Sequence, residues 1–111
     1  MTTIEQHADY ATLINVFTVE PGRAEELAAL LHAATDEVMR YQSGFRSANI
    51  HLSTDRTRVV NYAQWDSAEA YQAMLANPAT RPHMAQAAAI ATSFDPHLYT
   101  VESVHPTCEV T

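Results

Sequence analysis

The strongest constraint on the fold is the order in which strand-like and helix-like segments follow one another. Segments rich in β-branched and aromatic residues alternate with segments whose apolar residues recur at the helical period of 3.6. In chain order, the sequence predicts a strand, a helix, two strands, two helical stretches and a last strand, at residues 11–19, 23–41, 45–52, 58–65, 68–75, 83–91 and 97–104. Turn chemistry separates them, as at Gly44 and in the run "STDRT" at 53–57. We expect one domain over 10–105, with a flexible N-terminal arm at 1–9 and a C-terminal tail at 106–111.

The resulting order, β-α-β-β-α-β, predicts an α+β fold of the ferredoxin-like, split βαβ type. Such a fold places four antiparallel strands in one sheet and its helices on one face of that sheet. Proline supports the predicted break between the two helical stretches, because Pro78 and Pro82 are tolerated only where a helix begins. The run Phe94-Asp95-Pro96 is expected to end the second stretch before the last strand.

Apolar side chains occur on both faces of the predicted strands. Alternation places Leu13 and Phe17 on one face and Ile14 and Val16 on the other. In the third strand, the second face receives Val60, Tyr62 and Gln64. Since the helices can cover only one face, we expect a homodimer in which two sheets pack face to face, with Gln64 hydrogen-bonding across the interface.

Composition narrows the classes of partner. The chain has 111 residues, a net charge of −7 and no lysine, and its six arginines are scattered, which argues against binding nucleic acid. No apolar run approaches the length of a membrane span, and the first residues lack the pattern of a secretory signal. The single cysteine, Cys108, fits a reducing compartment. We therefore expect a cytoplasmic protein with no membrane partner.

The segment "VVNYAQW" at 59–65 places polar groups among strand-forming residues. Alternation puts Asn61 and Trp65 on one face, and Asn15 belongs with Phe17 on the corresponding side of the first strand. A buried amide without a partner costs about 1–3 kcal/mol, so these groups need hydrogen bonds. Two interpretations stay open from spacing alone. Either the amides and the indole N–H line a pocket for a large aromatic ligand, or Asn61 bonds to a neighbouring loop and Trp65 fills the core.

Other candidate groups are isolated. Tyr71, one turn into the helix after the third strand, either caps the same pocket with its hydroxyl or is an ordinary core residue. His51, at the end of the second strand, is either a pocket residue or a surface residue. The six histidines show no metal-binding spacing, and two glycines cannot form a phosphate-binding loop. We expect no metal and no nucleotide or flavin cofactor.

Three stretches carry a resemblance to a known family. They are "TLINVFTVEPG", "GFRSANIHLSTDRTRVVNYAQWDSAEAY" and "FDPHLYTVESVH", within residues 11–105. They resemble the antibiotic biosynthesis monooxygenase (ABM) domain family, and in particular its small quinone-forming enzymes of aromatic polyketide pathways. The resemblance implies a dimeric α+β barrel that oxidises an anthrone-type tricyclic phenol to a quinone with O2, without metal, flavin or haem.

The resemblance also implies roles for individual residues. Asn61 and Trp65 match the family residues that hold the substrate or peroxide oxygen, and Tyr71 matches one that orients the ring system. His51 matches a histidine that we expect to line the pocket. With Asn15 and Phe17 as further substrate contacts, these residues form the candidate site. An arginine found in relatives near the second helical stretch has no equivalent, since Gln86 lies near that place and Arg81 five residues earlier.

Three alternatives remain on the same scaffold. A haem-degrading monooxygenase is suggested by Asn15, although Met74 takes the place of a tryptophan and His83 lies one position from the expected histidine. A non-catalytic dimeric member is possible because fold does not determine function. An isomerase of small ketones would require His51 or His83 to line the cavity.

Overall fold

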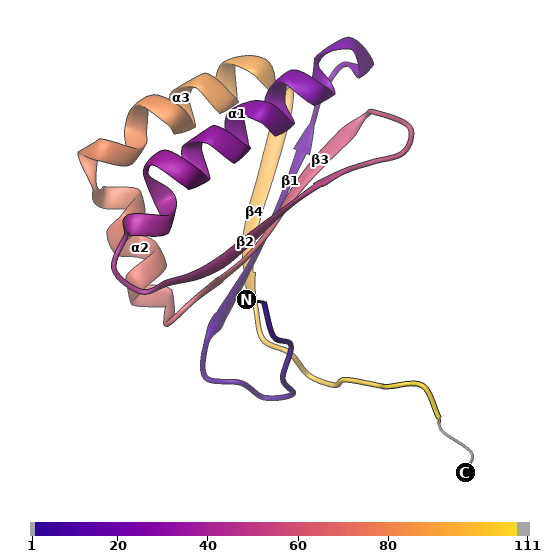
Figure 1. The fold of residues 1–111 in the computed structure, drawn as a ribbon, viewed down its shortest axis with the longest axis vertical. Coiled ribbons are helices and arrows are strands. Elements are labelled where there is room, and N and C mark those ends of the chain that lie inside the picture. The colour runs from indigo at the N-terminus through magenta and orange to yellow at the C-terminus, as the bar shows by residue number, and fades with distance from the viewer. Residues whose placement is uncertain (1, 109–111) are drawn as a thin grey trace.

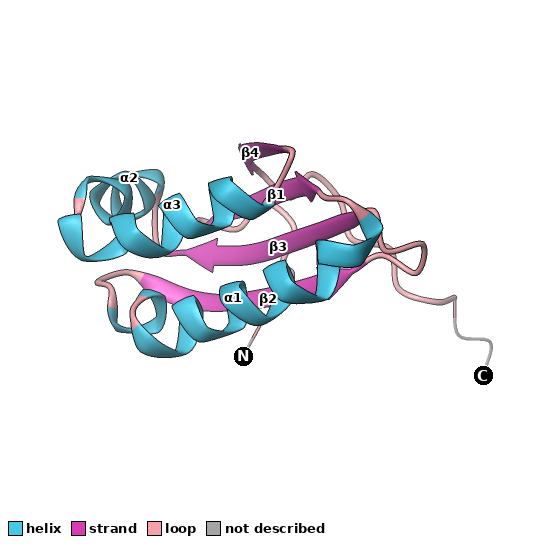
Figure 2. Cartoon of the chain, turned by 90° about the horizontal axis from the view of Figure 1, so that it is seen from above, coloured by secondary structure: helices cyan, strands magenta, loops and turns pink. Residues whose placement is uncertain are grey.

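The computed structural model describes residues 2–108 and shows one four-stranded antiparallel sheet with three α-helices on one face (Figure 1). The strands are β1 (Ala11–Thr18), β2 (Phe45–Leu52), β3 (Arg58–Trp65) and β4 (Ser93–Tyr99). The helices are α1 (Ala24–Glu37), α2 (Ala68–Ala76) and α3 (Arg81–Ile90), and short 3-10 turns lie at Pro21–Arg23, Met39–Tyr41 and Pro78–Thr80. The strands lie side by side in the order β2-β3-β1-β4 (Figure 2). The ferredoxin-like prediction is confirmed.

The first helix is shorter than the sequence pattern suggested. α1 ends at Glu37, and Val38 leaves helical geometry with φ −131° and ψ −54° before the chain continues as the 3-10 turn Met39–Tyr41. The apolar period continues through this turn, which explains the longer prediction of 23–41. The start of α2 is as predicted, because the Ser67 hydroxyl accepts a hydrogen bond from the Ala70 N–H at 3.1 Å.

The last strand begins earlier than predicted. β4 spans Ser93–Tyr99, so Phe94, Asp95 and Pro96 lie inside the strand that they were expected to precede. The order of the sheet explains this, because β4 is an edge strand and an edge strand tolerates proline. Its start is held by Thr92, whose N–H and hydroxyl both donate to the Thr18 carbonyl, at 2.8 and 3.0 Å.

The helices and the sheet enclose the core. One part centres on Leu27 and Val59, which are completely buried, and the other surrounds Trp65. The strand alternation predicted from the sequence is confirmed, since Asn15 pairs with Asn61 and Leu13 with Ala63 across β1 and β3. These residues therefore share the face that the helices cover.

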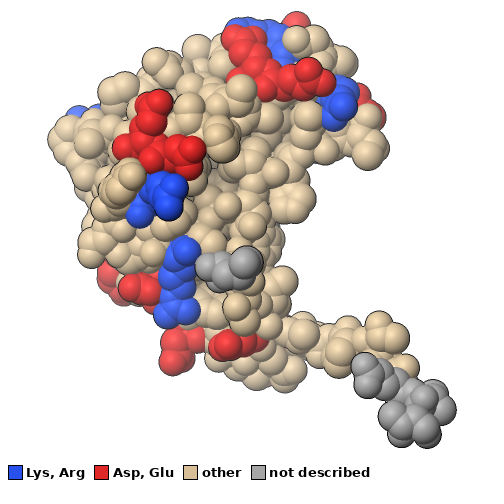
Figure 3. Space-filling view, viewed as in Figure 1, with Lys and Arg blue, Asp and Glu red and all other residues tan. Residues whose placement is uncertain are grey.

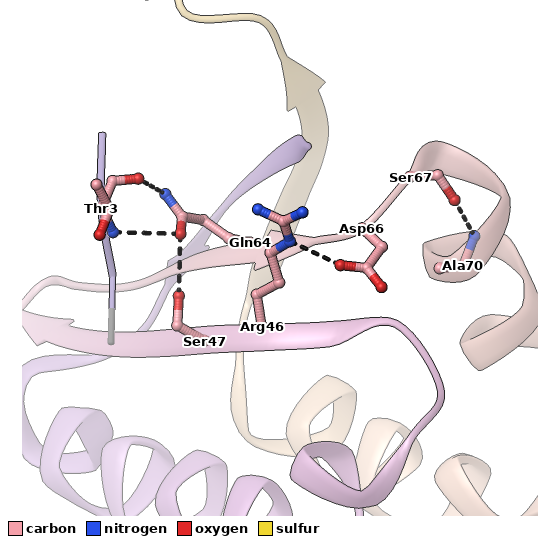
Figure 4. Close-up of polar contacts among 7 residues, drawn as sticks. All are labelled: Thr3, Arg46, Ser47, Gln64, Asp66, Ser67 and Ala70. Carbon is pink, nitrogen blue, oxygen red and sulfur yellow. Dashed lines mark hydrogen bonds and ion pairs between the residues drawn. The ribbon is translucent and has the colours of Figure 1, made fainter. Parts of the chain in front are cut away.

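The opposite face is partly covered by the chain itself. Gln64 is 2 % exposed, and its amide donates to the Thr3 carbonyl at 2.6 Å while its oxygen accepts from Ser47 at 3.4 Å (Figure 4). The predicted hydrogen bond of Gln64 across a dimer interface is therefore wrong, because the N-terminal segment of the same chain satisfies this side chain. The sequence pattern could not reveal a partner 61 residues away.

The two terminal segments contain no helix or strand where the structure describes them. Residues 2–9 hydrogen-bond to the sheet, as in the bond from the Thr2 hydroxyl to Ser47 at 2.8 Å, and the His7 N–H donates to the Val101 carbonyl beyond β4 at 2.8 Å. The extended C-terminal segment leads away from the fold (Figure 1). The parts of the predicted arm and tail at Met1 and 109–111 lie outside the described residues. Flexibility of the arm stays a prediction.

Charges on the surface are mixed. Four arginines each lie within 4 Å of a carboxylate, in the pairs Arg23–Glu26, Arg40–Asp36, Arg46–Asp66 and Arg56–Glu25. The view in Figure 3 accordingly shows blue beside red rather than a basic patch. Within residues 2–108, no helix combines the length and the apolar character that crossing a membrane requires.

Candidate active site

A cavity of about 350 Å³ lies between the covered face of the sheet and the helices. Its walls are mainly apolar and include residues of all four strands and all three helices. Among them are Leu13, Phe17, Leu31, Ala34, Phe45, Ala63, Tyr71, Met74, Ala87 and Phe94. This volume lies in the range of small-molecule binding sites, which are roughly 300–1,000 Å³. An open cavity of this size favours ligand binding over an interior that side chains fill completely.

Neighbouring strands bring two amides together inside this cavity. The register of β1 and β3 places Asn15 directly opposite Asn61, and both side chains line the cavity. Trp65, four residues along β3 on the same face, lines it too and is 2 % exposed. Period-2 alternation thus supplies three polar side chains from the floor of an otherwise apolar chamber.

Four buried polar atoms of the residues that line this chamber have no hydrogen-bond partner within the described chain. They are Oδ1 of Asn15, Oδ1 of Asn61, Nε1 of Trp65 and Nδ1 of His83, and each is buried. An unsatisfied buried polar group costs about 1–3 kcal/mol of folding free energy. Four together are a large destabilisation for a domain whose net stability is typically about 5–15 kcal/mol. The packing interpretation required Asn61 to bond to a neighbouring loop, and the described residues contain no such bond. The arrangement favours a ligand that carries oxygen atoms.

Aromatic rings hold Trp65 in place. Phe45 packs edge-on against the indole, with ring centroids 5.4 Å apart and planes at 88°. Tyr71 packs against the same indole, with ring centroids 6.2 Å apart and planes at 62°. Because these contacts restrict the indole rotamer, the N–H keeps one direction in the cavity. Tyr71 is itself 7 % exposed, and burial raises the pKa of its phenol above the ordinary value of 10.0.

The raised pKa of Tyr71 predicts a delayed titration. Of the five tyrosines, Tyr71 should ionise last when phenolate absorbance is followed through alkaline pH, and Tyr71→Phe should remove that last step. The pKa of Tyr71 is higher in the folded state than in the unfolded state. The contribution of Tyr71 to folding stability is therefore fully present below pH 10 and is lost as pH rises through the folded-state pKa. Tyr41→Phe, at a 74 % exposed position, is the control and should leave the last step in place. Loss of that step from the Tyr41 variant would contradict the assignment.

The structure brings five of the six predicted site residues together. Asn15, Phe17, Asn61, Trp65 and Tyr71 all line the cavity. His51 does not, because it pairs with Val60 on the opposite face, is exposed, and places its Nδ1 3.2 Å from the Asn49 carbonyl oxygen. Alternation along β2 dictates this, since Ile50 shares the covered face with Asn61 and its neighbour must point away.

Sequence reasoning missed part of the chamber. Residues of α1 and α3 line it, and among them His83 contributes a buried ring nitrogen. The sequence named His83 only as a requirement of the haem and isomerase alternatives. The sequence predicted a helical stretch at 83–91, but it did not indicate what that helix covers. Arg81 and Gln86 are exposed and do not line the cavity.

The described part of the chain lacks the usual pattern of metal-binding side chains. No group of three or more His, Cys, Asp or Glu side chains within residues 2–108 is arranged to hold an ion. The polar groups that line the cavity are amide, indole, hydroxyl and imidazole groups.

A family model and a sequence relative both indicate similarity to monooxygenases. The model of the family described as antibiotic biosynthesis monooxygenase matches residues 11–89. A stretch of 83 residues is 46 % identical to tetracenomycin-F1 monooxygenase of Streptomyces glaucescens, covering 75 % of this chain and 74 % of that protein.

Solved structures agree with this similarity. The monooxygenase encoded by ActVA-Orf6 of Streptomyces coelicolor, in complex with nanaomycin D, matches with a TM-score of 0.75 at 26 % identity, over 91 % of this chain and 95 % of that chain. SnoaB, a cofactor-independent oxygenase from Streptomyces nogalater, matches with a TM-score of 0.71 at 27 % identity, over 90 % and 100 % of the two chains.

Proposed function

The chain belongs to the antibiotic biosynthesis monooxygenase family and is a monooxygenase, and we propose that it oxidises an anthrone-type polycyclic phenol to a quinone with O2 and no cofactor. The substrate would be an aromatic polyketide. The observation that carries the proposal is the set of unpartnered polar atoms of Asn15, Asn61 and Trp65 inside an apolar cavity. An aromatic ligand with phenolic hydroxyls, which can donate to the two amide oxygens, and with a carbonyl oxygen, which can accept from the indole N–H, would satisfy these atoms.

Such a substrate supplies its own reducing electrons. Loss of a proton from the central CH₂ group leaves an enolate, which passes one electron to O2. The two radicals combine to form a C–O bond and hence a peroxide. The second C–H bond then breaks as the O–O bond breaks, so that one oxygen atom stays in the new carbonyl and the other leaves in water. Every electron that reduces O2 comes from the substrate, so the protein needs only to bind, orient and stabilise charge.

Named residues fit these tasks. Asn61 and Trp65 lie four residues apart on the same face of β3. There the Trp65 N–H and the Asn61 amide can each hydrogen-bond to an oxygen of the enolate or peroxide. Tyr71 stays protonated because burial raises its pKa, and its hydroxyl can donate to a second substrate oxygen. Phe17 and Phe94, with centroids 6.2 Å apart, provide an aromatic wall for the ring system.

A direct assay tests the proposal. Chelator-treated protein is mixed with an anthrone in air, and quinone absorbance and O2 consumption are followed together. We expect one O2 consumed per quinone at a rate well above buffer. No acceleration across several anthrones would refute the function. Titration of the same protein with haem separates the haem-degrading alternative, which a shifted Soret band would favour.

We also propose that the protein works as a homodimer through the uncovered face of the sheet. Ile14, Val16, Val60 and Tyr62 lie half-buried on that face, and the described chain covers it only in part. Apolar surface of this kind is costly to leave in water. We keep the prediction of a cytoplasmic location, which rests on the single, exposed Cys108.

The dimer proposal predicts a monomer when charge enters this face. Val60→Arg should convert the protein from a mass of two chains to a mass of one in sedimentation experiments, because a buried unpaired charge opposes association. Thr54→Arg, in the exposed hairpin turn, is the matched control and should leave the mass unchanged. A parent protein that sediments as a monomer at micromolar concentration would contradict the proposal.

A further inference from the structure

We propose that His83, positioned by Glu37, is the base that removes the proton from the substrate carbon. The inference rests on the proposed function, which requires a proton acceptor beside the bound ring system. His83 lies in the first turn of α3, lines the cavity and has 20 % of its side chain exposed. Its Nδ1 is buried without a hydrogen-bond partner in the described chain. Its Nε2 lies 3.5 Å from Oε2 of Glu37, the last residue of α1.

The two ring nitrogens thus have different environments. A carboxylate beside Nε2 favours the tautomer that carries its proton there, which leaves the lone pair on Nδ1. His83 lines the cavity, and Nδ1 is its ring nitrogen that is buried without a hydrogen-bond partner in the described chain. When Nδ1 accepts a proton, the positive charge of the imidazolium is shared with the side that faces Glu37. The pair therefore prepares the imidazole to accept a proton from inside the cavity and stabilises the product of that transfer.

His83 is also the residue that remains when the other cavity-lining residues are considered as possible bases. Asn15, Asn61 and Trp65 have no basic atom in the physiological range. Tyr71 is the only other titratable residue of the lining, and its raised pKa keeps it protonated. Among the described residues that line the cavity, His83 alone carries an imidazole, whose unprotonated ring nitrogen can act as a base.

The proton balance of the reaction uses this group twice. The substrate C–H bond breaks, its proton forms an N–H bond with Nδ1, and the electron pair stays on the substrate as the enolate. The imidazolium returns this proton to the newly formed peroxide. His83 then takes the second proton of the same carbon as the C=O bond forms and the O–O bond breaks. The departing hydroxide accepts that proton and becomes water, which regenerates neutral His83.

Hydrogen–deuterium exchange measures the proton step without oxidation. Under nitrogen and in D₂O, the parent protein should catalyse exchange at the reactive carbon of a bound anthrone, as followed by proton NMR. His83→Gln keeps a planar polar side chain but removes the basic nitrogen, so exchange and aerobic turnover should each fall about 10²–10⁴-fold. Anthrone affinity should stay within a few-fold of the parent. Added imidazole should restore part of the exchange in His83→Ala.

Two further variants separate catalysis from structure. His32→Gln, an exposed histidine of α1 beside Asp36, is the matched control and should behave as the parent. Glu37→Gln should lower kcat about ten-fold with little change in KM, and Glu37→Asp should recover most of the loss, as expected for a positioning residue.

The outcomes distinguish the base from the overall function. Exchange and turnover by His83→Gln within three-fold of the parent would overturn the role of His83 while the proposed function stands. Anaerobic exchange that depends on His83, without quinone formation in air, would overturn the function and support the base. A parent protein that catalyses neither reaction would overturn both.

Discussion

Asn61→Leu is expected to lower anthrone turnover about 10²–10³-fold, the usual effect of removing one group that stabilises a developing oxyanion. Leucine has nearly the same shape as asparagine but cannot hydrogen-bond. The same substitution should leave the protein as stable as the parent or more stable. Oδ1 of Asn61 is buried and has no partner in the described chain, so the fold loses nothing when the amide is removed. Its removal relieves an unsatisfied group worth about 1–3 kcal/mol.

The opposite combination is expected for Asn49→Leu, which is the matched control. Asn49 lies on the other face of the same sheet, and its amide donates to the Thr2 hydroxyl at 2.6 Å and to the Tyr62 carbonyl at 3.0 Å. Loss of these bonds should destabilise the fold, while kcat for correctly folded protein is retained. Steady-state assays and denaturant unfolding measure the two effects. An Asn61 variant that is both active and destabilised would show that the amide is structural.

Gly44→Ala should destabilise the protein by about 2–4 kcal/mol, since it combines a left-handed backbone with a steric clash. Gly44 has φ +84°, and a β-carbon there would lie 2.5 Å from Cβ of Ala70 in α2. Its carbonyl also accepts a hydrogen bond from the Asp66 N–H at 2.7 Å, so the turn cannot move freely. Because Tyr71 follows Ala70, the displacement of α2 should also weaken substrate binding.

Gly22→Ala is the control for this effect. No heavy atom lies within 4 Å of a β-carbon built at Gly22, and its φ lies outside the left-handed range. The substitution should be neutral or slightly stabilising, because it reduces the freedom of the unfolded chain. Urea unfolding of both variants compares them directly, provided that the slope of the transition is unchanged. Equal stabilities would contradict the role assigned to the turn before β2.

Local patterns predicted most of the elements, and the exceptions share a cause. Strands β1, β2 and β3 and the start of α2 follow from alternation, turn residues and the Ser67 cap, which all act over a few residues. β4 was placed too late because Phe94-Asp95-Pro96 was interpreted as the break after the second helical stretch, and proline is rare inside strands. Only the position of β4 at the sheet edge removes that objection, and position in a sheet is a property of the assembled fold.

The candidate site divides in the same way. The sequence by itself determined that Asn61 and Trp65 share a strand face, because side chains alternate with a period of two whatever the strand packs against. Only the tertiary structure decided that Asn15 lies opposite Asn61, that Gln64 bonds to Thr3, and that His51 is excluded from the cavity where His83 enters it. These relations join segments up to 61 residues apart. They depend on strand register and on the docking of α1 and α3, which long-range packing sets and local periodicity does not encode.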